Sequence, residues 1–276
     1  MACQLPPPRQ GPSLAPAAPL VRTCGDVRTL EFLPGEVQSA MRLSRPSALL
    51  LDYARAMMCF ALFVPHPRHI LMVGLGGGSL AKFCYRCFPH ARITVLELRA
   101  DVIALREQFG VPPDDARFTV VRADAAPYLA HVAGVAGARA RVDVLLVDGF
   151  TAAGLPPALG SARFYADCRR VLSPGGVLVA NMFSYDAQYA AMLGRLNWIF
   201  GSHVCRLDKV AGNNCILFAV RAPARAEQTH TPERRAHACT IVQLLARRHG
   251  TGIGLLNRLL VRAVLAYLAL HTRDAP

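Results

Sequence analysis

Lysine is almost absent from this chain, which has only Lys82 and Lys209 although lysine and arginine together number 31. Arginine and alanine are frequent instead, a composition typical of GC-rich genomes, and the formal net charge is +13. A nucleic-acid surface would group its basic residues and interleave them with aromatic side chains. Here the arginines are scattered, apart from short pairs such as Arg169-Arg170. The charge therefore does not indicate a nucleic-acid partner.

The sequence also lacks cysteines spaced for a metal site or a disulfide framework. Its nine cysteines stand singly except Cys84 and Cys87, and no second pair completes a zinc site. The N-terminus has no uninterrupted apolar segment of the secretory kind, because prolines break it. We therefore expect no metal, no disulfide framework and a cytoplasmic location.

Composition and pattern divide the chain into four parts. These are a disordered Pro/Ala-rich tail, an N-terminal β-region with a helix, a region of alternating strands and helices, and a linker with C-terminal helices, at 1–25, 26–68, 69–221 and 222–276. In the second part we expect short strands around a turn at 33–36 and a helix over 47–62 with Ser47 as its N-cap.

Strand and helix patterns alternate through the third part. The predicted strands are 69–73, 92–97, 118–122, 142–147 and 177–181, followed by an antiparallel pair at 204–207 and 215–221. The predicted helices are 79–88, 101–109, 125–132, 161–172 and 186–200. This alternation predicts a doubly wound, mostly parallel sheet, in which ligands bind beyond the carboxyl ends of the strands.

The fourth part contains a predicted helix at 236–248 and a strongly apolar segment at 253–270. The apolar segment reaches the lower limit of a membrane span. However, Arg258 and Arg262 are four residues apart and so share one helix face. This favours an amphipathic helix that packs on the domain or on a partner, without stable insertion into a membrane.

Glycines follow the first predicted strand, at Gly74, Gly76, Gly77 and Gly78, and a helix begins near Ser79. Glycine allows the backbone to turn tightly and to approach a ligand closely. The free N–H groups of the following helix then face that ligand. The pattern predicts a nucleotide site, although a glycine-rich turn without a ligand has the same appearance.

Acidic residues end the next three predicted strands. Glu97 follows Gly77 by 20 residues and could accept hydrogen bonds from both ribose hydroxyls. Because the glycines read Gly-x-Gly-Gly-Gly, an adenosyl sulfonium fits better than a dinucleotide. Asp124 could accept from an adenine amino group or cap the next helix. Asp148 could deprotonate an attacking amine, or be a capping or loop acid.

Taken together, these motifs resemble the spermidine synthase (polyamine aminopropyltransferase) family over roughly residues 30–220. The matching segments are Val37-Gln38-Ser39, the loop Gly74–Gly78, Glu97, Asp124-Ala125, Val147-Asp148 and Phe164-Tyr165-x-x-Cys168. The resemblance implies a Rossmann-like S-adenosylmethionine-dependent methyltransferase fold, preceded by a small β-region. It also implies a homodimer and a reaction that needs no metal.

The resemblance further implies a role for each matching residue. The donor, decarboxylated S-adenosylmethionine, would be held by Gln38, Gly74, Gly76, Gly77, Gly78, Ser79, Glu97, Asp124 and Ala125. Asp148 would be the catalytic acid/base, and the acceptor amine would lie near Tyr53, Thr151 and Tyr165. The implied reaction moves an aminopropyl group to a polyamine such as putrescine.

The chain departs from this family at three positions that would contact amines. Ser79 and Thr151 each stand where the family has an aspartate, and Tyr53-Ala54-Arg55 replaces a segment that ends in glutamate. Burying an ammonium without a partner is costly. Three hypotheses therefore remain: an aminopropyltransferase, an S-adenosylmethionine-dependent methyltransferase on the same fold, and a non-catalytic nucleoside-binding protein.

Overall fold

A computed structural model describes residues 18–135, 141–150, 154–201, 203–211, 213–222 and 253–271. The predicted helix at 236–248 and Thr151 lie outside these residues.

A small antiparallel sheet forms the N-terminal region. Its strands are β1 (Leu20–Cys24), β2 (Val27–Glu31) and β3 (Val37–Arg42), in that order. The predicted turn between the second and third strands is confirmed, and the Glu36 N–H donates to the Leu33 carbonyl at 3.0 Å. The strand β1 was not predicted: the proline-rich composition placed these residues in the tail, whereas all five pair with β2.

The first helical segment begins later than the sequence predicts. It consists of α1 (Asp52–Met57), followed directly by the 3₁₀ helix η1 (Met58–Leu62). Its N-cap is Leu51, so the prediction of Ser47 was wrong. Ser47 lies instead in a turn, in which the Ala48 N–H donates to the Arg45 carbonyl at 3.0 Å.

The central sheet has seven strands in the order β6-β5-β4-β7-β8-β10-β9. They are β4 (His69–Val73), β5 (Arg92–Glu97), β6 (Phe118–Arg122), β7 (Val142–Val147), β8 (Leu172–Phe183), β9 (Val204–Ala211) and β10 (Asn214–Val220). The first five in this order are parallel, and β10 is antiparallel to both β8 and β9. The predicted doubly wound sheet is confirmed. Its winding reverses between β4 and β7, which is where such sheets bind ligands.

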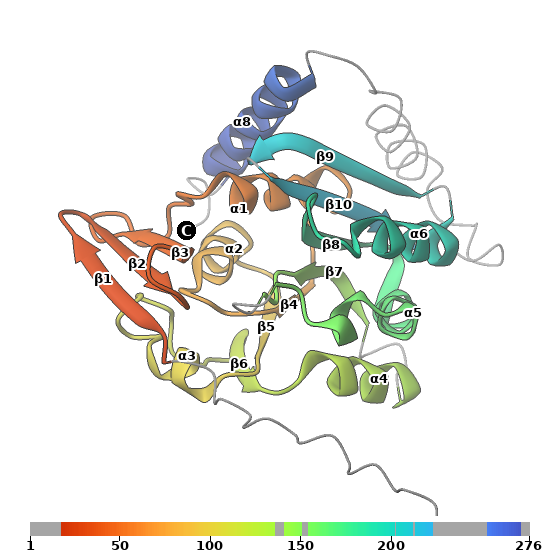
Figure 1. Cartoon of the computed structure of the whole chain (residues 1–276), viewed down its shortest axis with the longest axis horizontal. Coiled ribbons are helices and arrows are strands. Elements are labelled where there is room, and N and C mark those ends of the chain that lie inside the picture. The colour runs from red at the N-terminus through yellow and green to blue at the C-terminus, as the bar shows by residue number, and fades with distance from the viewer. Residues whose placement is uncertain are drawn as a thin grey trace, which may run out of the picture.

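Helices cover both faces of this sheet (Figure 1). They are α2 (Ser79–Cys87), α3 (Ala100–Ala104), α4 (Ala125–Val135), α5 (Ala162–Val171), α6 (Tyr189–Phe200) and α8 (Ile253–His271), with a short 3₁₀ helix η3 (Pro157–Gly160). Alternate residues of β7 enter two separate cores: Val144 and Leu146 pack on the side of α1, α2 and α8, and Leu145 and Val147 on the side of α4, α5 and α6. Burial on both faces explains why this strand is an unbroken apolar run.

Several further element boundaries differ from the predictions, and three of them are informative. The helix predicted at 101–109 ends at Ala104 and continues as turns. The helix predicted from Asp186 begins at Tyr189, because the Asp186 carboxylate accepts from the Gln188 N–H at 2.7 Å in a preceding turn. Finally, β8 begins at Leu172, and its Pro-Gly-Gly segment lies within the strand, where the register with β7 shifts.

The C-terminal helix α8 is amphipathic and contacts β9, η1, α1 and α2. Its residues Val261, Val264 and Leu268 are buried, whereas Arg258 and Arg262 are exposed. The predicted packing of this segment on the domain is therefore confirmed. Among the residues that the structure describes, no helix is both long and apolar enough to cross a membrane.

Candidate active site

The strands β4 and β7 end side by side at the reversal of the sheet. The Asp148 N–H donates to the Val73 carbonyl at 2.9 Å. Gly74 has a φ of +95°, and a Cβ there would lie 2.4 Å from the carbonyl oxygen of Asp148. Glycine is thus required at this position, because it lets the loop after β4 touch the backbone of the residue that the sequence singles out as catalytic.

The rest of the glycine loop is packed against two other segments. A Cβ on Gly77 would lie 2.7 Å from Oγ of Ser39, and one on Gly78 would lie 2.3 Å from Cγ2 of Val111. By contrast, a Cβ on Gly76 would have only the Ser39 Cβ near it, at 3.8 Å. Gly78 is the N-cap of α2, and no side chain caps that helix end. The first N–H groups of α2 therefore remain to bind a ligand.

The Ser79 side chain faces β3. Its hydroxyl lies 3.2 Å from the hydroxyl of Ser39 and 3.4 Å from the carbonyl oxygen of Ala40, to which it donates. The first turn of α2 is thus joined to the N-terminal sheet by neutral groups.

One helical turn further on, Lys82 is 2% exposed and donates to the carbonyl oxygen of Phe109 at 2.5 Å. Its Nζ also lies 3.0 Å from the Met41 sulfur. Burial lowers the pKa of this lysine from 10.5 to about 8. Sequence reasoning missed this residue, although the scarcity of lysine and its spacing of three from Ser79 were available signals.

Glu97 lies at the end of β5 and is 8% exposed. One carboxylate oxygen accepts from the Leu75 N–H at 2.8 Å, and the other accepts from the Arg99 N–H at 2.9 Å. Glu97 therefore stabilises the glycine loop that follows β4. A carboxylate has about four lone-pair positions, so both oxygens can accept further hydrogen bonds from a diol.

Asp124 is exposed and accepts from the Ala126 N–H at 3.0 Å at the start of α4. The capping role that the sequence left open is thus present. Its neighbour Ala125 is buried. The Ala123 N–H donates to the Glu97 carbonyl at 3.0 Å, so Asp124 follows a segment joined to the end of β5.

Asn181 holds the carboxylate of Asp148 by donating its Nδ2 to Oδ1 at 2.9 Å. Burial raises the pKa of Asp148, while Asn181 and the nearby Tyr53 hydroxyl oppose the rise. The Tyr53 hydroxyl donates to the backbone carbonyl oxygen of Gln38 at 3.3 Å. The structure thus brings Asp148, Tyr53 and Gln38 together, with Gln38 contributing its backbone to this contact.

Asn181 was not among the predicted site residues, because in the sequence it is only the last residue of the strand predicted at 177–181. It is 2% exposed, and its Oδ1 accepts from Nδ2 of Asn214 at 2.8 Å. A polar residue that ends an apolar run, in the strand that follows the one ending at Asp148, is a signal that would have identified it.

Of the other predicted acceptor residues, Tyr165 is 1% exposed and lies in the core on the α4, α5 and α6 side. Its hydroxyl has no hydrogen-bond partner within the described part of the chain, and burial raises its pKa.

Arg55, which replaces an acid of the family, bonds to the Asp52 carboxylate and to the Leu49 carbonyl, each at 2.8 Å. Its charge is thus paired with a carboxylate.

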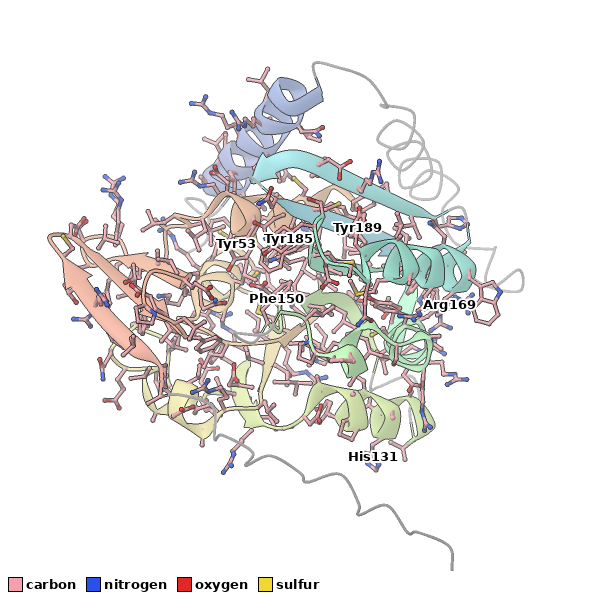
Figure 2. All side chains as sticks on the ribbon, in the orientation of Figure 1. Tyr53, His131, Phe150, Arg169, Tyr185 and Tyr189 are labelled. Carbon is pink, nitrogen blue, oxygen red and sulfur yellow. The ribbon has the colours of Figure 1, made fainter. Side chains whose placement is uncertain are left out.

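Three aromatic rings follow Asp148 and Asn181 closely in sequence and contact one another. Phe150 and Phe183 each follow one member of the pair by two residues, and their ring centroids are 4.6 Å apart. Tyr185 stacks on Phe183 at 5.2 Å and is 68% exposed. Figure 2 labels Tyr53, Phe150 and Tyr185 near the middle of the molecule. This group of rings therefore joins the two segments that carry Asp148 and Asn181.

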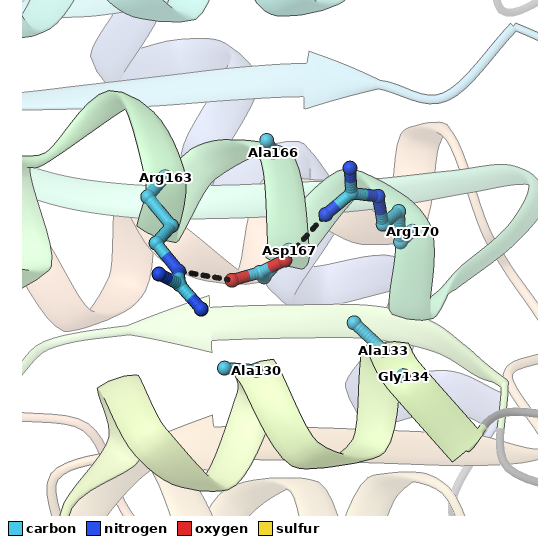
Figure 3. Close-up of a pocket in the computed structure, with 7 residues that line it drawn as sticks. All are labelled: Ala130, Ala133, Gly134, Arg163, Ala166, Asp167 and Arg170. Atoms are coloured by element: carbon cyan, nitrogen blue, oxygen red, sulfur yellow. Dashed lines mark hydrogen bonds and ion pairs between the residues drawn. The ribbon is translucent and has the colours of Figure 1, made fainter.

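A separate hollow lies between α4 and α5, away from these strand ends (Figure 3). Ala130, Ala133 and Gly134 line one side of it. On the other side, Asp167 pairs with Arg170 at 2.8 Å and with Arg163 at 3.9 Å. None of the predicted site residues lines this hollow.

The sequence matches no protein-family model. The polyamine aminopropyltransferase of Chromobacterium violaceum is 37% identical over 213 residues, which are 77% of this chain and 79% of that protein. Human methyltransferase-like protein 13, solved in complex with SAH, is 26% identical with a TM-score of 0.53, over 72% of this chain and 91% of that chain. A probable spermidine synthase from Corynebacterium glutamicum has a TM-score of 0.62 at 23% identity, over 89% of this chain and 91% of that chain, and so shares the fold.

Proposed function

Because this chain belongs to the polyamine aminopropyltransferase family, we propose that it transfers the aminopropyl group of decarboxylated S-adenosylmethionine to a polyamine such as putrescine. The chain is an aminopropyltransferase-like enzyme on the Rossmann-like methyltransferase fold. The observation that carries the proposal is the position of Asp148. Its backbone touches Gly74 of the glycine loop at the reversal of the sheet, and its carboxylate is hydrogen-bonded to Asn181.

In the proposed reaction, Asp148 accepts a proton from the acceptor ammonium. The lone pair of the amine then forms a C–N bond to the carbon next to the sulfonium, and the C–S bond breaks. The bonding electrons pass to sulfur, and methylthioadenosine leaves. The burial that raises the pKa of Asp148 suits a group that must take up a proton near neutral pH.

On the donor side, the residues fit an adenosyl group. Glu97 would accept from the two ribose hydroxyls, and the open backbone at Gly76 would allow the nucleoside to come close. We assign the adenine amino group to Asp124, which can accept this bond while it caps α4.

On the acceptor side, Phe150 and Phe183 would contact the methylene chain of a polyamine. An ammonium can also bind to the face of an aromatic ring. These rings would replace part of the attraction that the family obtains from the acids absent at Ser79 and Thr151. The Tyr53 hydroxyl would contact the amine next to Asp148. A role for Tyr165 would require its buried hydroxyl to reach the acceptor.

Calorimetric titration with decarboxylated S-adenosylmethionine and with S-adenosylmethionine tests the choice of donor. Incubation with the decarboxylated donor and putrescine, followed by mass spectrometry, tests the reaction. We expect tighter binding of the decarboxylated donor, a product heavier by one aminopropyl group, and methylthioadenosine. Tighter binding of the carboxylated donor without aminopropyl transfer would refute the proposal.

Methyl transfer from S-adenosylmethionine is a second candidate, and the environment of Ser79 favours it. A serine bonded to neutral groups tolerates a donor that keeps its carboxylate, whereas an aspartate would repel it. The similarity to a human methyltransferase also supports this candidate. A product heavier by one methyl group, formed together with S-adenosylhomocysteine, would establish it over aminopropyl transfer.

We also propose that the enzyme is a homodimer, on the basis of the family resemblance. Sedimentation equilibrium tests this, and a molecular mass of one chain at all concentrations would refute it.

A further inference from the structure

Three polar side chains form a row across the edge of the sheet. Asp148 follows β7, Asn181 lies near the end of β8, and Asn214 begins β10. These strands are neighbours in the sheet, and Asn181 lies opposite Ile216, two residues beyond Asn214. Nδ2 of Asn214 donates to Oδ1 of Asn181 at 2.8 Å, and Nδ2 of Asn181 donates to Oδ1 of Asp148 at 2.9 Å.

The fold alone gives no reason for an amide at this place. The neighbours of Asn181 along the strand, Val179, Ala180 and Met182, are all apolar and buried. A buried amide is costly unless it is hydrogen-bonded. Here its two polar ends are bonded to Asn214 and to Asp148, so the row of contacts compensates for the burial.

The chemistry of the three groups sets the direction of the row. An ionised carboxylate only accepts hydrogen bonds, so Asn181 must turn its NH₂ toward Asp148. Its carbonyl oxygen must then face β10, where Asn214 supplies an N–H. Asn214 therefore disfavours the flipped amide, which would turn an oxygen toward the carboxylate.

We propose that Asn181, oriented by Asn214, is a positioning residue for the reaction: it fixes Oδ1 of Asp148, favours the ionised carboxylate, and leaves Oδ2 for the acceptor amine. This inference rests on the proposed role of Asp148. Among the described groups, Tyr53 on α1 is the titratable one that acts on this carboxylate. The adjoining end of β4 contributes Gly74, and β8 and β10 contribute the two amides.

The test uses Asn181→Leu, which keeps the approximate shape and removes the amide. We expect kcat to fall by about 10-fold or more, and the acid limb of its pH profile to move up by about one unit or more, because a hydrogen bond to a charged group is lost. Donor affinity should stay within about 2-fold. Asn214→Ala should produce smaller changes in the same directions, while Asn214→Ser, which keeps a donor, should recover part of the loss.

Asn257 on α8 offers a matched control. It is also a buried asparagine, and it donates to the Asp208 carbonyl at 3.1 Å. Asn257→Leu should leave the pH profile unchanged. Unchanged kcat and pH profile in Asn181→Leu would overturn the inference, as would equal shifts in Asn257→Leu. If Asn181→Leu does not fold, Asn214→Ala and Asn214→Ser decide by the same readouts.

A titration of ¹³C-labelled aspartate by NMR separates this inference from the proposed function. The Asp148 signal is assigned by its loss in Asp148→Asn, and it needs no turnover. A higher titration midpoint of that signal in Asn181→Leu supports the positioning role even if the transferred group is not aminopropyl. An unchanged midpoint overturns it even if aminopropyl transfer is established.

Discussion

Replacing Gly78 by alanine should destabilise the protein and weaken donor binding, because two separate features of the structure require glycine there. The backbone of Gly78 has a φ of +67°. An L residue in this left-handed region costs about 1–2 kcal/mol. The added Cβ would also lie 2.3 Å from Cγ2 of Val111, a separation at which the neighbour must shift.

The size of the steric part follows from that separation. Ordinary contact begins at 3.4 Å, so Val111 would have to move by about 1 Å within a packed core. Overpacking of this kind costs about 1–3 kcal/mol. Together with the backbone strain, we expect Gly78→Ala to lower the free energy of unfolding by about 2–5 kcal/mol.

Denaturant unfolding of a double-mutant cycle separates the two parts. Val111→Ala alone should cost about 2 kcal/mol, because it removes two buried methyl groups. In Gly78→Ala/Val111→Ala the clash is relieved and only the backbone strain remains. The double variant should then be about 1–3 kcal/mol more stable than the sum of the single changes predicts. Calorimetry of the same proteins should show weaker donor binding whenever alanine replaces Gly78.

A matched control is Gly134→Ala in α4, where an added Cβ meets nothing within 4 Å. It should be neutral or stabilise the protein by up to about 1 kcal/mol. Additive effects of the Gly78 and Val111 changes, within about 0.5 kcal/mol, would refute the steric argument. If Gly78→Ala changes the free energy of unfolding no more than Gly134→Ala does, both the steric and the backbone parts of the argument are refuted.

Asp148→Asn should lower kcat by about 10²–10⁴-fold and leave donor affinity within a few fold, and turnover equal to that of the wild type would remove Asp148 from its role. In the wild type, kcat should fall as the pH drops through the raised pKa of Asp148, since the base is then protonated. For Lys82, the folded-state pKa of about 8 is below the unfolded value of 10.5, so the unfolded chain binds more protons between these values and stability should rise with pH. Denaturant unfolding should show that the free energy of unfolding of the wild type rises relative to that of Lys82→Met by up to about 3 kcal/mol between pH 8 and 10.5. A difference that does not change with pH would contradict the burial of a charged lysine. Leu268→Ala should cost about 2–5 kcal/mol, whereas Leu270→Ala, at a site 60% exposed, should stay within about 0.5 kcal/mol; equal effects would show that α8 does not pack as described.

The strands of the central sheet could be predicted from the sequence closely. The predicted boundaries of β5, β6 and β7 coincide with the observed ones. Their apolar runs are local, and a strand buried on both faces needs such a run wherever it lies in the chain. The glycine loop and the acids at the ends of β5 and β7 could likewise be predicted, because they too are local features of the sequence.

Other boundaries could not be predicted because their determinants are distant in sequence. The strand β1 exists through its pairing with β2, which overrides a composition typical of tails. The start of α1 is a local exception: a turn at 45–48 holds Ser47, and the helix begins after it, with Leu51 as its N-cap. In β8, pairing with β7 and β10 extends the strand across a Pro-Gly-Gly segment that reads as a loop.

The sequence by itself determined the sheet and the residues that end its strands, since strand periodicity and glycine spacing are properties of short segments. Only the tertiary structure decided what those residues contact. Ser79 meets Ser39 across 40 residues, and Asn181 meets Asp148 across 33. Hydrogen bonds form within about 3 Å in space whatever the separation along the chain. For that reason the hydrogen bonds that orient the Asp148 carboxylate could not be predicted from any local pattern.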